Sequence, residues 1–246
     1  MDREEWQKKG EGHRQRLREK FLQLGINAFT DDEVLELLLT FGTPRTDCKA
    51  AARAAKAHFG TLAAVLAAPL PELLKIKGLG PKNIFALHFV QGVARRYLKQ
   101  QLANKTYVTS SRAVADYLIH EMRDRKREVF LAMFLDAAHA IIETEVLAEG
   151  TVSVNTVYPR ELVQRALAHN AAALVVAHNH PSGSLTPSRQ DLDLTKTLLL
   201  VCSFMNIALL DHLIVGAGEE VYSFADHGIM TDLRAQSARL LNQPAG

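Results

Sequence analysis

The stretch AAALVVAHNHPSGSLTPSRQD, residues 171–191, decides the fold of the second half of the chain. Its first seven residues are small or apolar and predict a fully buried strand. His178 and His180 follow, two positions apart, so an extended backbone points both imidazoles to the same side of the strand end. Two imidazole nitrogens that meet at one point can chelate a single metal ion.

The loop that follows the histidines can supply a third ligand. PSGSLTP, residues 181–187, contains two prolines and a glycine, which favour tight turns and would let the chain fold back. The carboxylate of Asp191 would then reach the two histidines. Imidazole and carboxylate ligands without a thiolate favour zinc, with an open fourth position for a water whose pKa falls to about 7. We therefore expect one Zn²⁺ per chain.

The same residues have a purely structural interpretation. Ser188 and Asp191 have the S-x-x-D spacing of a capping box, which would simply begin a helix. The pair of histidines could likewise be two polar loop residues. Here a core strand ends in two histidines, and a loop rich in proline and glycine and the S-x-x-D pattern follow it. Packing alone rarely needs this combination, which therefore favours a metal site.

Around this stretch, strand patterns and helix patterns alternate. Pro159 is well placed to begin a helix that precedes the buried strand, and a second helix is expected over residues 188–205. A helix on either side of a buried strand predicts an α/β or α+β sandwich. The expected strands are residues 128–136, 140–150, 153–158, 207–216 and 220–224.

The N-terminal half has a helical pattern from about residue 14 to residue 100. Thr30 and Glu33 have capping-box spacing, Gly42 is expected to end the helix that they begin, and Asp47 can cap a further helix that ends at Gly60. No strand is expected in this region, so the first domain is predicted to be all-α.

Two helical patterns over residues 70–96 flank a turn with Gly78 and Gly80, and Lys77 and Lys82 lie beside it. Glycines allow backbone amides to approach an anion, and the new helix adds a favourable dipole. The segment resembles the helix-hairpin-helix motif, which binds nucleic-acid phosphate without reading sequence. A plain structural hairpin is the alternative, so non-sequence-specific DNA binding is an expectation for these four residues.

Charge and composition favour two domains. Of the 246 residues 48% are hydrophobic, and the net charge is +2, but residues 1–105 hold 18 Lys and Arg against 11 Asp and Glu, whereas the remainder is acidic. A basic half suggests a polyanionic partner, and a solvated charged surface is the alternative. We expect a basic helical domain over residues 1–104, an α/β domain over residues 105–230 and a tail over residues 231–246.

The location of the chain is expected to be cytoplasmic. The first residues contain no apolar run that could serve as a signal peptide, and eighteen uncharged apolar residues never follow one another, so no membrane partner is expected. Cys48 and Cys202 are the only cysteines, far apart in sequence, and are predicted to be reduced core thiols.

The motif at the strand end also carries a family resemblance. HNHP, six residues and S-x-x-D match the JAMM metalloprotease signature, H-x-H-x7-S-x-x-D, without a gap. With VYPRELVQRAL before it, DHLIVG after it, and HRQRLREKF and DDEVLELLL near the start, the chain resembles the RadC family from about Gly12 to Gly228. The resemblance implies a helix-hairpin-helix domain followed by a JAMM/MPN domain, a deaminase-like three-layer α/β fold.

The resemblance also implies roles for individual residues. His178, His180 and Asp191 would ligate zinc, and Ser188 would hold a water or steady an oxyanion. Glu128, which directly precedes a strand, is the candidate general base. Its alternative is a surface ion pair with the basic residues before it. Glu143 and Glu145 are rivals for the base, and Asp211 and His212 could lie behind the ligands, although a structural hydrogen bond at a strand end is the favoured interpretation of both.

Three classes of function compete. The first is a zinc metallopeptidase or isopeptidase with an unknown protein or peptide substrate, tethered to DNA by its basic domain. The second is a DNA-binding repair or recombination accessory protein whose metal centre is structural or inactive. The third, an enzyme acting on nucleic acid, is disfavoured because zinc deaminases need a CxxC pair that is absent from the sequence, and because the HNH nuclease residues are widely spaced rather than adjacent.

Overall fold

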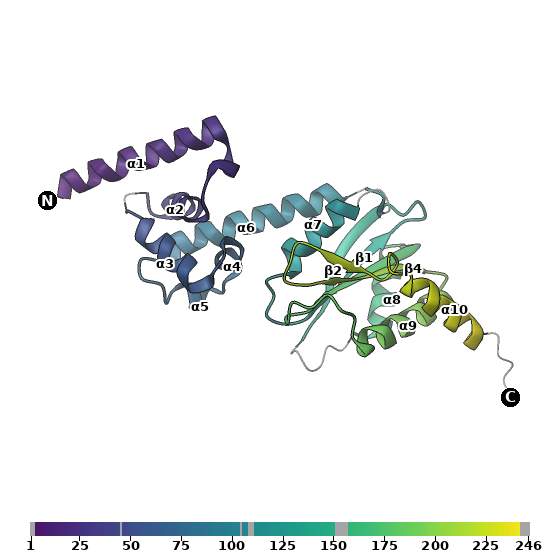
Figure 1. The fold of residues 1–246 in the computed structure, drawn as a ribbon. Helices are drawn as coiled ribbons and strands as arrows, with labels where there is room; N and C mark the ends of the chain where they lie inside the picture. The colour runs from purple at the N-terminus through teal and green to yellow at the C-terminus, as the bar shows by residue number, and fades with distance from the viewer. Residues whose placement is uncertain (1–2, 45, 104, 108–110, 151–156, 242–246) are drawn as a thin grey trace. The chain divides into compact units, whose positions relative to one another are not determined.

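The computed structural model describes residues 3–44, 46–103, 105–107, 111–150 and 157–241 (Figure 1). The chain divides into two compact units, Met1–Ala94 and Arg95–Gly246, which we call the N-terminal and C-terminal units. The division lies ten residues before the one expected at residue 104, inside helix α6 (Pro81–Leu102). The reason is packing, because Leu98 and Leu102 in the last turns of α6 join the core of the C-terminal unit.

The described residues of the N-terminal unit contain helices and no strand, as predicted. The elements before α6 are α1 (Arg3–Leu24), a 3-10 turn (Ile26–Ala28), α2 (Asp31–Gly42), α3 (Lys49–Phe59), α4 (Leu62–Ala67) and α5 (Leu70–Leu73).

Local signals fix several of these helix ends. Thr30 and Glu33 form the predicted capping box, in which the hydroxyl oxygen of Thr30 accepts from the amide of Glu33 and the Glu33 carboxylate accepts from the amide of Thr30. Gly60 ends α3 with a φ of 88°, a conformation that glycine adopts without strain. Asp47 contributes at the start of α3 by accepting a 2.9 Å hydrogen bond from the amide of Lys49, although Cys48 occupies the cap position.

The core of the N-terminal unit is built from apolar side chains of five helices. Leu35 and Leu39 of α2, Leu73 of α5, and Ile84 and Leu87 of α6 are almost completely buried. Small residues allow the helices to approach closely. Gly42 ends α2 directly against the start of α6, where an added Cβ would collide with the carbonyl oxygen of Lys82.

The C-terminal unit contains a five-stranded mixed sheet in the order β2-β1-β3-β4-β5. Strands β3 and β4 are parallel, and the other neighbours are antiparallel. The elements are α7 (Ser111–Met122), β1 (Val129–Leu135), β2 (Ile141–Glu149), α8 (Pro159–Ala168), β3 (Ala173–Asn179), α9 (Arg189–Phe204), β4 (Ala208–Val215), β5 (Val221–Ser223) and α10 (Ile229–Leu241).

Helices cover both faces of this sheet. Residues of α8, α9 and α10 pack with alternate residues of β1 and β3 on one face, and residues of α7 with the end of α6 pack on the other (Figure 1). The two central strands, β1 and β3, are therefore buried along their whole length. This three-layer α/β arrangement agrees with the fold class expected for the second domain.

Two helices of the C-terminal unit differ from the expectations from sequence. The expected elements of the second domain begin at residue 128, but α7 occupies Ser111–Met122, and Val114, Leu118 and Met122 lie on its buried face at helical spacing. The expected tail is helical as far as Leu241, and Leu233 in it is buried against the sheet. The strand expected over residues 153–158 falls largely outside the described residues.

Both cysteines are free and buried, in agreement with their prediction as core thiols. Burial raises the pKa of the Cys202 thiol to about 11, so this thiol is protonated at neutral pH. Within the described part of the chain, no helix is both long enough and apolar enough to cross a membrane.

Candidate metal centre

Strand β3 delivers the two histidines to the rim of the sheet. Leu174 and Val176 point toward the face covered by α8 and α9, and the strand alternation places His178 on that same face, where it is only 4% exposed. His180 follows the strand, and its amide donates a 2.9 Å hydrogen bond to the carbonyl of Val215. The two imidazoles consequently lie at one end of the sheet, with their Nε2 atoms 2.9 Å apart.

The loop after His180 folds back as expected. The amide of Gly183 donates to the carbonyl of His180 at 2.8 Å, and Gly183 has a φ of 81°. An added Cβ at Gly183 would lie 2.9 Å from the side chain of Ala217, so both the conformation and the space require glycine. The carbonyl of Ser184 lies 2.9 Å from Nδ1 of His180. Because a carbonyl only accepts, Nδ1 carries the proton, and the lone pair of His180 is on Nε2.

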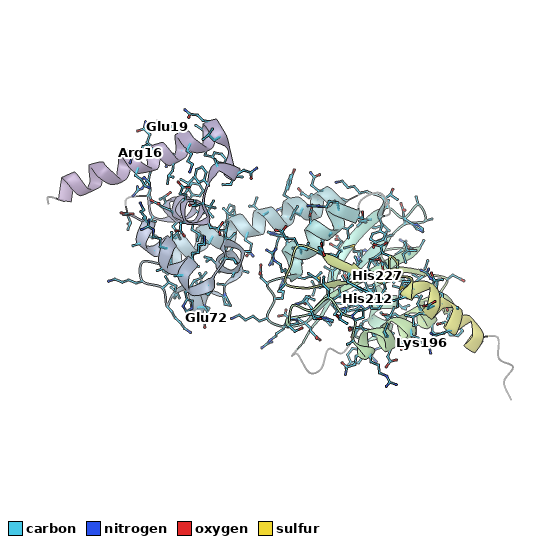
Figure 2. The ribbon with its side chains drawn as sticks, in the orientation of Figure 1. Arg16, Glu19, Glu72, Lys196, His212 and His227 are labelled. Carbon is cyan, nitrogen blue, oxygen red and sulfur yellow. The ribbon has the colours of Figure 1, made fainter. Side chains whose placement is uncertain are left out.

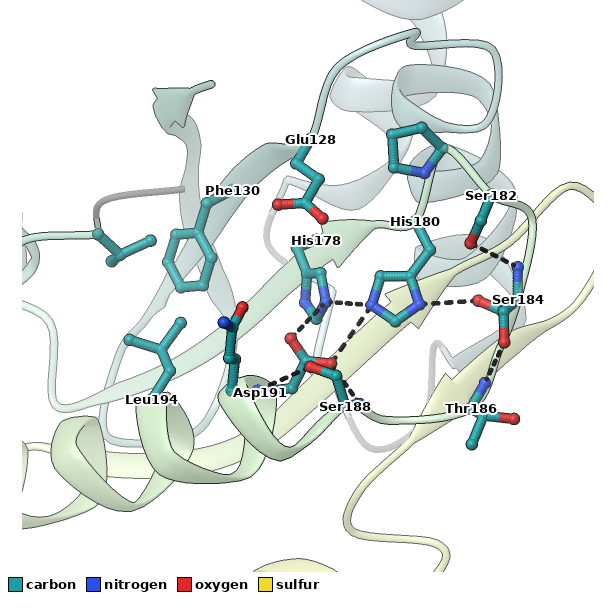
Figure 3. A pocket seen from close by; sticks show the side chains of 13 residues that line it. Glu128, Phe130, His178, His180, Ser182, Ser184, Thr186, Ser188, Asp191 and Leu194 are labelled. Carbon is teal, nitrogen blue, oxygen red and sulfur yellow. Dashed lines mark hydrogen bonds and ion pairs between the residues drawn. The ribbon is translucent and has the colours of Figure 1, made fainter. Parts of the chain in front are cut away.

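Asp191 completes the group from the first turn of α9. Ser188 and Asp191 form the predicted capping box, in which Oδ2 of Asp191 accepts from the amide of Ser188 at 2.7 Å. The same carboxylate faces the histidines, with Oδ1 3.1 Å from Nε2 of His178 and Oδ2 3.3 Å from Nε2 of His180 (Figure 3). The structural interpretation and the metal interpretation of these residues are thus compatible.

The geometry of these three side chains fits a zinc ion. One nitrogen or oxygen from each residue lies within 4.8 Å of the others. A tetrahedral ion with bonds of about 2.0–2.1 Å holds its ligand atoms roughly 3.3 Å apart. The separations of 2.9, 3.1 and 3.3 Å among these atoms are close to that value.

The electrostatics of the group also suit a cation. Burial alone would raise the pKa of Asp191, but its interactions with the rings of His178 and His180 outweigh burial, and the pKa of this carboxyl lies well below its usual range. The hydrogen bond to Asp191 raises the pKa of His180. The ionised form of this carboxylate, at the N-terminus of α9, is further stabilised by the helix dipole.

A cavity of about 550 Å³ opens over these residues. Glu128 lines it together with His178, His180, Ser188 and Asp191 (Figure 3). The position of Glu128 follows from the sheet, because β1 and β3 are antiparallel and Phe130 pairs with His178. Continued by two residues, this register sets Glu128 across from His180.

Asn179, between the two histidines, fixes the segment that carries Glu128. It is only 1% exposed, and its Oδ1 accepts a 2.7 Å hydrogen bond from the amide of Val129. Its Nδ2 donates to the carbonyls of Arg125 and Arg127, each at 3.2 Å. The sequence alone indicates no role for this asparagine, because its partners are about fifty residues away in the chain.

The rival glutamates are engaged elsewhere. Glu143 accepts from Lys99 at 2.6 Å, and Glu145 lies 2.7 Å from the ring nitrogen of His169. Both belong to β2 and are not among the residues that line the cavity. Arg125, which could have paired with Glu128, instead contacts Glu121 at 2.8 Å. Among the described residues that line the cavity, Glu128 is therefore the one glutamate.

Asp211 and His212 differ in what they contact, although they are adjacent in β4. Asp211 accepts hydrogen bonds from the hydroxyls of Tyr107 and Ser223, at 2.9 and 2.6 Å, and serves the packing of the C-terminal unit. His212 lies behind the metal ligands, with Nε2 2.8 Å from Nδ1 of His178. Asp211 therefore makes structural hydrogen bonds. His212 instead contacts a metal ligand, His178.

The turn before α6 brings together the four residues expected to bind phosphate. Gly78 has a φ of 92°, and Lys77 and Lys82 are exposed beside it. The amide of Gly80, however, already donates a 2.7 Å hydrogen bond to the side chain of Asn83. The helix before the turn, α5, has only four residues. These observations do not establish a helix-hairpin-helix motif.

Comparison with known proteins agrees with this fold and site. The RadC-like JAB domain family matches residues 108–229, and the UPF0758 N-terminal family matches residues 10–85. The chain is 42% identical to a UPF0758 protein of Ralstonia nicotianae over 216 residues, which cover 88% of this chain and 96% of that protein. It is 40% identical to a UPF0758 protein of Nitrosomonas europaea over the same shares of both chains.

A third relative is a UPF0758 protein of Burkholderia cenocepacia, 41% identical over 219 residues that cover 89% of this chain and 85% of that protein. The mixed sheet with a His-His-Asp group at its rim defines the class, a JAB-type domain preceded by a helical domain. Within that class, the chain belongs to the UPF0758 family of RadC-like proteins.

Proposed function

We propose that this protein is a zinc-dependent hydrolase of amide bonds, a metallopeptidase or isopeptidase. The observation that carries the proposal is the convergence of His178, His180 and Asp191 in a cavity that also contains Glu128. Three metal ligands beside one glutamate are the groups that metal-assisted hydrolysis requires. Membership of the RadC-like JAB domain family supports the same class of reaction.

Zn²⁺ and Glu128 have separate roles in the proposed hydrolysis. Bound Zn²⁺ supplies a Lewis acid that polarises a carbonyl and lowers the pKa of a water molecule. Glu128 takes one proton from the attacking water as the carbon–oxygen bond forms, and returns that proton to the nitrogen as the carbon–nitrogen bond breaks. The products are a carboxylic acid and an amine, so atoms and charge balance.

Ser188 is assigned to the oxyanion. Its oxygen accepts from the amide of Asp191 at 3.2 Å, and its side chain lines the cavity, where the hydroxyl would donate to the oxyanion. A hydroxyl donor aimed at a developing negative charge contributes about 3 kcal/mol in comparable sites. Ser188→Ala is expected to slow turnover about 100-fold while zinc content stays full.

The test compares Glu128→Gln with Glu143→Gln, a matched change on the neighbouring strand and outside the cavity. Zinc-loaded wild type and both variants are incubated with a cell lysate, and new peptide termini are measured by mass spectrometry. Glu128→Gln is expected to lose turnover by about 100- to 10,000-fold with zinc retained, and Glu143→Gln to keep it. Equal cleavage by Glu128→Gln and wild type would exclude this mechanism.

The same experiment separates the alternative function. If the protein is a DNA-binding accessory protein with a structural metal centre, Glu128→Gln leaves every activity and phenotype unchanged, and zinc removal lowers stability only. The hydrolase proposal requires that phenotypes of the Glu128→Gln strain match those of a strain that lacks the protein.

Association with DNA is a second proposal, for the N-terminal unit. It is supported by the basic composition of residues 1–105 and by the exposed Lys77 and Lys82 on either side of the turn at Gly78 and Gly80. Because Asn83 occupies the amide of Gly80, the two lysines rather than that amide would bind the phosphate. No sequence preference is expected, since binding to phosphates carries none.

Salt titration of the full chain against duplex and branched DNA tests this proposal. For duplex DNA, the slope of log K against log salt concentration should become shallower by about 0.9 for each phosphate that a variant no longer neutralises. Lys77→Ala and Lys82→Ala are expected to show this change, and Lys126→Ala, an exposed lysine of the C-terminal unit, is the control. Binding that is absent at low salt would remove the proposal.

A further inference from the structure

Two buried polar side chains next to the site have no part in the chemistry proposed above. His212 of β4 and Thr195 of α9 are each 0% exposed, and His212 lies inside the C-terminal unit (Figure 2). A polar group in such a position costs stability unless it is hydrogen-bonded. What the two side chains bond to therefore indicates why they are there.

Their hydrogen bonds form a continuous chain between two metal ligands. Nδ1 of His178 lies 2.8 Å from Nε2 of His212, and Nδ1 of His212 lies 2.6 Å from the hydroxyl of Thr195. That hydroxyl lies 2.5 Å from the backbone carbonyl of Asp191, one helical turn before it in α9. This series of hydrogen bonds begins at the metal ligand His178 and ends at the backbone of the metal ligand Asp191.

The carbonyl at the end of this series of hydrogen bonds determines which atom donates in each of them. The carbonyl of Asp191 can only accept, so the hydroxyl of Thr195 donates to it and accepts from Nδ1 of His212. His212 then carries its proton on Nδ1 and offers the lone pair of Nε2 to His178. Consequently Nδ1 of His178 is the donor, and Nε2 of His178 is the atom left for a metal.

Neighbouring rings hold His212 in this orientation. The ring of Phe224 lies 4.8 Å from that of His212, centroid to centroid, and the ring of Phe130 meets it edge-on at 6.1 Å. Both phenylalanines are fully buried. Rotation of the imidazole would therefore require the core around it to move.

We propose that His212 is a positioning residue, which with Thr195 holds a proton on Nδ1 of His178 and thereby directs Nε2 of His178 to the metal. The proposal rests on the proposed metal site and not on amide hydrolysis. Hydrogen-bond partners behind a ligand typically contribute about 10- to 100-fold to metal affinity. His180 needs no such chain, because the carbonyl of Ser184 fixes its protonation directly.

Nuclear magnetic resonance of the nitrogen-labelled full chain tests the proton positions. Two-bond nitrogen–proton spectra distinguish protonated ring nitrogens from those with a lone pair. With and without zinc, Nδ1 of His178 and Nδ1 of His212 are expected to be protonated, and Nε2 of His212 unprotonated. A proton on Nε2 of His212 would overturn the proposal, and no variant has to fold for this result.

Zinc affinity, measured by competition with a chelator, provides the second arm. His212→Leu is expected to bind zinc about 10- to 100-fold more weakly. In His212→Gln the amide oxygen can accept from His178, and affinity should stay closer to wild type. His169→Leu, the same change at a histidine that contacts Glu145, is the control and should have no effect.

The outcomes separate this proposal from the hydrolase. Wild-type affinity in a folded His212→Leu variant, checked by thermal melting without metal, would refute a positioning role. The expected proton positions and the weaker zinc binding, together with no cleavage by zinc-loaded wild type, would support positioning and remove the hydrolase proposal alone.

Discussion

The loop before α9 and the turn before α6 are built alike, yet they leave different groups exposed to a ligand. In each, a side chain in the first helical turn reaches back to an amide at the helix start: Asp191 to Ser188, and Asn83 to Gly80, both at 2.7 Å. Asp191 has a second oxygen, and it faces His178. Asn83 directs its other polar atom to the carbonyl of Gly78, which closes the turn on itself.

A capped helix start is therefore not in itself a binding site. At the sheet rim, a neighbouring strand adds two histidines, so the capping carboxylate has a second task. At the turn before α6, the side-chain amide of Asn83 satisfies the backbone of Gly78 and Gly80, and the flanking lysines are exposed to a partner. Substitutions in the loop before α9 should therefore change zinc binding, whereas matched substitutions in the turn before α6 should not.

The largest effect is expected from Asp191→Ala. This change removes a metal ligand, so zinc content measured by elemental analysis should fall from about one per chain to a trace. Loss of the cap should cost about 1 kcal/mol of stability, which the core can tolerate. His178→Ala should lose zinc as well, whereas Asp193→Asn, an exposed carboxylate two residues on, should retain it. Full zinc in Asp191→Ala would contradict this assignment.

Next in size is Asn179→Ala, which tests the placement of Glu128. Without the three hydrogen bonds of Asn179, the segment before β1 loses its attachment to the end of β3. Turnover is expected to fall about 100-fold, because a misplaced general base loses most of its effect. Zinc content should stay near one per chain. If zinc is lost as well, the asparagine supports the ligands rather than the glutamate.

A matched pair of glycines gives a smaller effect. Gly183→Ala and Gly78→Ala each force a positive φ on alanine and bring its Cβ to within 2.9 or 3.0 Å of another alanine side chain. Each should lower the free energy of unfolding by about 1–3 kcal/mol, measured by chemical denaturation. Only Gly183→Ala should also weaken zinc binding. Equal zinc affinities in the two variants would show that the loop before α9 does not position Asp191.

The smallest effect is expected from Asn83→Ala. The amide of Gly80 and the carbonyl of Gly78 lose their partner, and stability should fall by about 1–2 kcal/mol. Zinc content and turnover should not change. If instead the freed amide of Gly80 strengthens DNA binding at low salt, the self-closure of the turn is what limits phosphate binding there.

Local sequence patterns are sufficient to predict several helix ends, the buried strand and the metal group. Capping boxes at Thr30 and Ser188, the buried strand before His178, and the spacing of the two histidines depend on neighbours in the chain, and each is present. The metal group is predictable because its third ligand lies only eleven residues beyond His180. A short closing loop brings that ligand within reach.

Pairings between distant segments cannot be predicted in this way. His212 reaches His178 only because β4 lies parallel to β3, and Asn179 reaches Val129 only because β1 lies antiparallel to it. Sequence does not specify which strands are neighbours or in which register. Helix α7 is a different case, because Val114, Leu118 and Met122 have helical spacing in the sequence, yet no helix was expected between residues 104 and 128.

The central claim is that one metal ion sits between two imidazoles and a carboxylate at the sheet rim. Anomalous diffraction at the zinc edge, from crystals of protein purified without chelator, tests it most directly. We predict one peak per chain within about 2.0–2.2 Å of Nε2 of His178, Nε2 of His180 and an oxygen of Asp191. A peak elsewhere, or ordered side chains around water alone in zinc-supplemented crystals, would contradict it.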